Sequence, residues 1–211
     1  MISHHIRVFV LAAAAFSPAF LVGQEPTAPL PSPAQPGPPS TQDSNTSGDT
    51  IQSMRDKGFL RKATEGSLAE VQFGRLAVEK GASNDVKSLG QMMIDDHTKL
   101  NEKMAPIADS IGVMLPKRLS KEDQAEYDKI SALTGDEFDK EYIATMVKDH
   151  HADLREFRIE ANSTNDPILK QAVTDGAQII HDHMVMIDKM ARSKGIAIPG
   201  GHSRPAPPPG V

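Results

Sequence analysis

The chain has 211 residues, a formal net charge of −5 and no cysteine, which excludes disulfides, thiolate metal sites and cysteine nucleophiles. The mildly acidic balance, with seven Phe, two Tyr and no Trp, argues against a nucleic-acid-binding protein. Of sixteen prolines, seven lie in residues 26–39 and five in residues 199–209, so the middle of the chain is the part that is expected to fold.

The N-terminal segment has the pattern of a secretory signal peptide over residues 1–23. Arg7 precedes the apolar run Val8–Phe16, and small residues follow where cleavage can occur. The alternative, a retained membrane anchor, is less favoured because residues 8–22 are shorter than the roughly 20 apolar residues of a spanning helix. We therefore expect an exported protein of the periplasm or cell envelope, without a transmembrane span after cleavage.

Four segments are expected along the chain. The signal peptide is followed by a Pro-rich disordered linker (24–50), a helical domain (51–198) and a disordered tail (199–211). Within the domain, apolar residues recur with three- and four-residue spacing, and no segment alternates with period two. The spacing predicts four long helices, at 54–80, 84–111, 136–161 and 167–193, and a short helix at 120–133. This order predicts an all-α fold, a ferritin-like antiparallel four-helix bundle of two helical hairpins with the short helix in the crossover.

Each long helix carries one ionisable residue within its apolar stripe. These residues are Glu70, His97, His150 and His183. Counted from the hairpin turns at about 1.5 Å per residue, all four lie near the middle of the bundle. One carboxylate and three imidazoles that converge there would suit a transition metal ion: zinc, iron or manganese. The methionines of the helices leave copper as a less favoured ion.

The histidines of the second and third long helices end a repeated pentapeptide, Met93–His97 and Met146–His150, with the pattern M-[IV]-x-D-H. Asp96 and Asp149, which precede the two histidines, are candidates for outer partners of ring nitrogens or for additional ligands. His151 and His181 are alternative ligands. The spacing leaves open whether His181 or His183 faces inward.

The ordered series of motifs resembles a known family. The segments Phe59–Ala63 and Glu70–Ala77, the two pentapeptides, Asp166-Pro167 and His183-Met184 are similar to domain-of-unknown-function family 4142. The resemblance implies a ferritin-like bundle in an exported protein, often labelled a predicted outer-membrane protein, and implies no established activity.

The pattern departs from ferritin-like oxidases, whose di-iron sites use Glu-x-x-His. Ile94, Val147 and Ile180 stand three residues before the three histidines. Neither ferroxidase nor manganese-catalase activity is therefore expected, and no catalytic residue is assigned.

Three functions are compatible with the sequence. The first is binding of a transition metal for storage, sensing or stress protection in the envelope. The second is a metal-free helical interaction module with an envelope protein as partner, in which a buried Glu–His network sets the packing. The third is a metal-dependent oxidoreductase with an open coordination position. The sequence does not determine the oligomeric state.

Overall fold

The structure is a computed structural model that describes residues 43–200, with side chains from residue 47. It contains five helices: α1 (Asp43–Lys80), α2 (Asn84–Ser110), α3 (Lys121–Ser131), α4 (Gly135–Ser163) and α5 (Pro167–Ser193). Over this range the extended pairing is one isolated bridge, between Gly81 and Gly135. The expected signal peptide, most of the linker and residues 201–211 of the tail lie outside the described residues.

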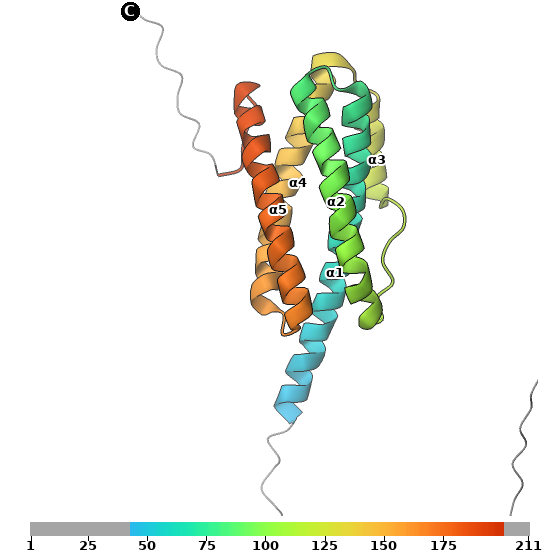
Figure 1. Cartoon of the computed structure of the whole chain (residues 1–211), viewed down its shortest axis with the longest axis vertical. Helices are drawn as coiled ribbons and strands as arrows, with labels where there is room; N and C mark the ends of the chain where they lie inside the picture. The colour runs from blue at the N-terminus through green and yellow to red at the C-terminus, as the bar shows by residue number, and fades with distance from the viewer. Residues whose placement is uncertain (1–42, 201–211) are drawn as a thin grey trace, which may run out of the picture. The chain divides into compact units, whose positions relative to one another are not determined.

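The four long helices form the expected bundle, with α1 and α2 as one hairpin and α4 and α5 as the other (Figure 1). The hairpins join through contacts of α1 with α4 and of α2 with α5. The short helix α3 lies in the crossover and packs on α1 and α4. The predicted ferritin-like class is confirmed. Within residues 43–200, no helix combines the length and apolarity that a membrane span requires.

Helix α1 begins earlier than the sequence predicts. It starts at Asp43, within the segment 24–50 that was expected to be linker. Residues 47–50 are exposed, and the first turns of α1 extend beyond the neighbouring helices (Figure 1). Because an existing helix gains one hydrogen bond for each residue added, a polar segment can prolong it. The polar composition of this segment therefore did not mark the start of the helix.

The buried stripe in the middle of α1 differs by one position from the stripe that the sequence predicts. The spacing of Phe59, Ala63 and Gly66 predicts that these residues face inward, whereas Leu60, Thr64 and Ser67 are the buried residues. Adjacent residues on a helix point about 100° apart, so this shift rotates the inward face. It brings Ser67 into the bundle and turns Gly66 toward α4.

Two carboxylates fix helix starts in the hairpins. The buried Asp139 of α4 accepts hydrogen bonds from the backbone N–H of Ala82 (2.8 Å) and of Ser83 (3.1 Å), and Ser83 caps α2. Asp166 caps α5, with Pro167 in its first turn. The contacts of Asp139 tie the turn between α1 and α2 to the start of α4.

Helices α1 and α2 pack backbone to backbone at Gly74 and Gly90. A Cβ at Gly74 would lie 2.6 Å from the Gly90 carbonyl oxygen, and a Cβ at Gly90 would lie 2.6 Å from that of Gly74. Only glycine permits this approach. Glu70 is one turn from Gly74 and His97 about two turns from Gly90, so the crossing holds these side chains close together.

A buried pair of carboxyl groups lies at the end of the bundle that is far from the Gly74–Gly90 crossing. Glu160 of α4 is 5% exposed and Asp56 of α1 is 8% exposed. Asp56 accepts hydrogen bonds from Gln52 (2.6 Å) and Thr164 (3.2 Å). Burial, together with a hydrogen bond and the negative charge of Asp56, raises the pKa of Glu160 to about 7, and Arg55 opposes the shift.

This pair predicts a pH dependence of stability. Because the folded-state pKa of Glu160 is raised from 4.5 to about 7, its protonated form favours folding at low pH, and this stabilisation is lost as pH rises through that window. A cleft of about 520 Å³ reaches the site and admits water. We therefore expect Glu160→Gln to increase the free energy of unfolding by about 1–2 kcal/mol at pH 8, with little change at pH 4. Urea unfolding at both pH values measures this, with the more exposed Glu156→Gln as control. An equal effect at both pH values would contradict it.

Candidate metal centre

The ionisable residues of the four apolar stripes form a polar layer between two apolar clusters. On one side are Phe73, Met93, Met146 and Ile187, with others. On the other side are Leu60, Leu100, Leu154 and Ile180, with others. The four polar residues between them, Glu70, His97, His150 and His183, are each at most 2% exposed. The expectation that they meet at mid-bundle is confirmed by this placement.

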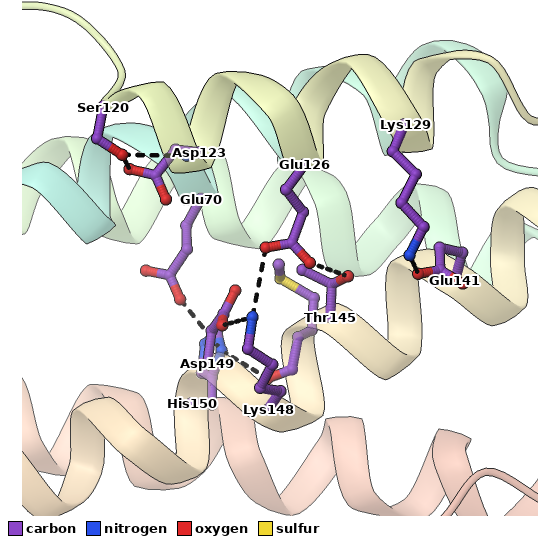
Figure 2. Close-up of polar contacts among 11 residues, drawn as sticks. Glu70, Ser120, Asp123, Glu126, Lys129, Glu141, Thr145, Lys148, Asp149 and His150 are labelled. Atoms are coloured by element: carbon purple, nitrogen blue, oxygen red, sulfur yellow. Dashed lines mark hydrogen bonds and ion pairs between the residues drawn. The ribbon is translucent and has the colours of Figure 1, made fainter.

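Glu70 of α1 reaches two of the three histidines. Its Oε2 lies 2.8 Å from Nδ1 of His97, and its Oε1 lies 3.2 Å from Nδ1 of His150. Figure 2 shows the second of these contacts. Neither oxygen has a hydrogen-bond partner. Burial, and then the negative charges of Asp149 and Asp123, raise the pKa of Glu70 well above its usual value.

The partners of His97 indicate which of its ring nitrogens carries the proton. The Ser67 hydroxyl donates to the His97 carbonyl oxygen (3.1 Å) and lies 3.2 Å from Nδ1, so its oxygen can accept from an Nδ1–H. This assignment leaves a lone pair on Nε2, which is buried and has no hydrogen-bond partner.

The partners of His150 and His183 likewise indicate which of their ring nitrogens carry protons. The remaining two nitrogens then direct their lone pairs toward each other. Nδ1 of His150 lies 3.2 Å from the Met146 carbonyl oxygen, and Nε2 of His183 lies 3.1 Å from a carboxylate oxygen of Asp96. Both partners are acceptors, so these two nitrogens carry the protons. Nε2 of His150 and Nδ1 of His183, which are 3.4 Å apart, then both present lone pairs. A cation between them would satisfy both.

The three histidines lie close enough together to hold a metal ion. One nitrogen from each of His97, His150 and His183 lies within 4.8 Å of the other two. Burial lowers the pKa of His97 to about 4, lowers that of His150 well below its usual value and also lowers that of His183. The imidazoles are therefore held in the neutral form, which is the form that binds metals.

The two aspartates of the repeated pentapeptide have different surroundings. Asp96 contacts Nε2 of His183 and also pairs with Lys99 at 3.2 Å. Burial alone would raise the pKa of Asp96, but the hydrogen bonds from His183 and Lys99 outweigh it and lower the pKa. Asp149 instead contacts Lys148, on the side of α4 that faces α3 (Figure 2). Burial raises the pKa of Asp149 to about 6.

The alternative histidines lie outside the cluster. His151 contacts Asp188 of α5 through its Nε2 at 3.0 Å. The side chain of His181 is 40% exposed and pairs with its neighbour Asp182. The rotation of α5 that the sequence left open is thus settled with His183 inward.

Two residues of this region, Ser67 and Asp153, were not predicted from the sequence. Ser67 lies on the true inward stripe of α1, one residue from the expected stripe, and a search for polar residues three positions before Glu70 would have found it. Asp153 of α4 lies 3.7 Å from the position that a Cβ on Gly66 would take. Burial, and then the charges of Glu70 and Asp149, raise the pKa of Asp153 to about 8. Asp153 follows His150 by three residues, which places it on the neighbouring face of the helix.

Glu70 also lines a cleft of about 400 Å³ between α1, α3 and α4. The other acidic residues that line it are Glu65, Glu122, Asp123, Glu126, Asp149 and Asp153. Glu70, whose carboxylate contacts His97 and His150, therefore lies between the cleft and these histidines.

Two solved structures of DUF305 proteins are similar in fold. A fragment from Deinococcus radiodurans superposes with a TM-score of 0.56 at 14% identity, over 67% of this chain and 95% of that one. A protein from Streptomyces coelicolor, described provisionally as secreted, gives 0.58 at 16% identity, over 70% of this chain and 97% of that one. At these identities the likeness shows the fold alone.

No curated protein matches the chain. The model of the family described as Domain of unknown function (DUF4142) matches residues 40–190, which span all five helices up to the end region of α5. The match includes Glu70, the three inward histidines and Asp96. The resemblance that the motifs suggested is thereby confirmed, and this chain belongs to the DUF4142 family.

Proposed function

We propose that the protein binds one divalent transition metal ion through His97, His150 and His183. The observation that carries the proposal is the pair of lone-pair nitrogens, Nε2 of His150 and Nδ1 of His183, that face each other 3.4 Å apart beside the unpartnered Nε2 of His97. Three neutral imidazoles are a donor set that suits zinc, and also iron or manganese, with copper less favoured.

The carboxylates take outer positions in this proposal. Asp96 would orient His183, and Glu70 would act on the Nδ1 side of His97 and His150, as carboxylates do behind metal-bound histidines. Because burial favours the neutral form of Glu70, a bound cation would promote its ionisation and so balance part of the added charge. Asp149, His151 and His181 have no part in the proposed site.

The cellular role that fits this site is metal storage, sensing or stress protection in the cell envelope. The expected signal peptide at 1–23 supports export, and residues 24–42, which precede α1, would then tether the bundle. A DUF305 neighbour of similar fold is itself described provisionally as secreted. N-terminal sequencing of the protein recovered from the periplasm tests export, and cleavage near Gly23 is the expected result.

Elemental analysis of the untagged protein tests the metal site. We expect about one metal ion per chain after reloading with zinc, iron or manganese, and loss of that ion in the folded variant His97→Ala/His150→Ala. The matched control is His151→Ala/His181→Ala, which removes two histidines outside the cluster. Absence of metal from the parent after reloading would leave the alternative, a structural Glu–His network in a metal-free bundle.

A further inference from the structure

The acidic cleft between α1, α3 and α4 carries more negative charge than its two lysines balance. Besides Glu70, six acidic side chains line it; Asp153, whose pKa is about 8, is protonated at pH 7, which leaves five carboxylates against Lys62 and Lys148. Lys148 pairs with Asp149 (3.5 Å) and with Glu126 (3.4 Å), as Figure 2 shows. Lys62 pairs with Glu156 at 3.7 Å, and Glu156 is not among the residues that line the cleft. The interior of the cleft is therefore an environment that attracts cations.

Glu70, which contacts two of the three histidines, is one of the residues that line the cleft. Glu70 is 2% exposed, and both of its oxygens lack a hydrogen-bond partner. These oxygens nevertheless lie within 2.8 and 3.2 Å of ring nitrogens of His97 and His150. A cation that arrives in the cleft would thus meet an unsatisfied buried carboxylate, with the histidine cluster directly behind it.

The opposite side of the histidine cluster offers a poorer approach. Asp96 is the carboxylate there, and its oxygens already engage His183 (3.1 Å) and the ammonium group of Lys99 (3.2 Å). The positive charge of Lys99 would repel an incoming metal ion. Since His97, His150 and His183 are each at most 2% exposed, an ion needs a route through the bundle wall.

We infer that the cleft lined by Glu65, Glu122, Asp149 and Asp153 is the access route by which metal cations reach the histidine cluster, with Glu70 as the gate between them. The inference rests on the proposed function, because it concerns how metal ions reach the same site. It assigns a role to carboxylates that contact no histidine, and it makes the rate of metal uptake, rather than the affinity, the quantity that they control.

A charge variant tests the route. Glu65→Gln/Glu122→Gln removes two cleft carboxylates for which the structure shows no side-chain contact. Stopped-flow absorbance with cobalt(II) measures the association rate constant at low salt. We expect a decrease of about threefold to tenfold, with the dissociation rate unchanged and a weaker salt dependence. The matched control is Glu102→Gln/Asp109→Asn, which removes two exposed carboxylates of α2 and should leave the rate as in the parent.

A steric variant tests the same route independently of charge. Gly66 lines the cleft, and a Cβ there meets only Asp153 Oδ2, at 3.7 Å. Gly66→Ala should therefore fold normally and take up cobalt at the parent rate, whereas Gly66→Leu should obstruct the cleft and slow uptake at least tenfold. Circular dichroism and a thermal melt establish that both variants are folded.

The outcomes separate this inference from the proposed function. If cobalt binds to the parent but neither the charge pair nor Gly66→Leu slows its uptake, the cleft is not the route, while the histidine site stands. If the α2 control slows uptake and the cleft variants do not, ions arrive from the Asp96 side, and the inference is overturned. If the parent binds neither cobalt nor zinc, the proposed function itself fails.

Discussion

Saturation with zinc is expected to raise the Tm of the protein by about 10 °C, because an ion that binds only the folded state at about 1,000 times its Kd adds about 4 kcal/mol of stability. The physical reason is the buried layer of His97, His150 and His183, which in the absence of a cation leaves lone pairs opposed at 3.4 Å and an unpartnered nitrogen. Those uncompensated polar groups disfavour the folded state until an ion binds them.

Differential scanning calorimetry with and without zinc measures this shift. The variant His97→Gln/His150→Gln keeps polar side chains in the layer and should lose the zinc-dependent increase entirely. The control His151→Gln/His181→Gln should keep it, since neither residue faces the cluster. An equal increase in all three proteins would show that zinc stabilises the fold from somewhere other than this layer.

Glu70→Gln is expected to have opposite effects on stability and on metal binding. Because burial raises the pKa of this carboxyl, the folded state keeps it protonated while the unfolded state ionises it above about pH 4.5, so the stability of the folded state falls as pH rises. Glutamine matches the neutral acid in shape and removes that cost. We therefore expect the metal-free variant to be more stable than the parent by about 1–3 kcal/mol at pH 8, and the difference to vanish at low pH.

Metal affinity should change in the other direction. Without the carboxylate behind His97 and His150, the variant should bind zinc about 10–100-fold more weakly. Urea unfolding of the metal-free protein and competition with a chromophoric chelator give the two numbers. A purely structural Glu70 predicts the change in stability alone, so an unchanged zinc affinity would remove Glu70 from the site. Glu65→Gln, on the same helix, is the control for affinity.

The sequence alone was sufficient for most of the fold. The three- and four-residue spacing of apolar residues placed all five helices, and Asp166-Pro167 located the start of α5. These features are local, because a helix is closed by hydrogen bonds between residues four apart and is ended by its own capping residues. The start of α1 at Asp43 was not predicted, because a helix that has formed can continue through polar residues.

Spacing also identified the polar layer. Glu70, His97, His150 and His183 interrupt apolar stripes at matching heights, and antiparallel packing of helices with a fixed rise brings such residues together. The sequence could not assign their roles, since a residue's height says nothing about the direction of its ring nitrogens. Those directions depend on Met146, Ser67 and Asp96, which lie on three different helices.

Only the tertiary structure decided the helix rotations and what lies between the helices. Rotation of α5 turned His183 inward and left His181 with Asp182, and a one-residue shift of the α1 stripe brought in Ser67 and turned Gly66 to Asp153. The cleft exists only because α3 returns across α1 and α4, which places Glu122 and Asp123 beside Glu70. A periodic pattern fixes rotation no more finely than one residue, about 100°, and it carries no information on contacts between distant segments. The packing of the helices against one another determines both the rotation of each helix and these contacts.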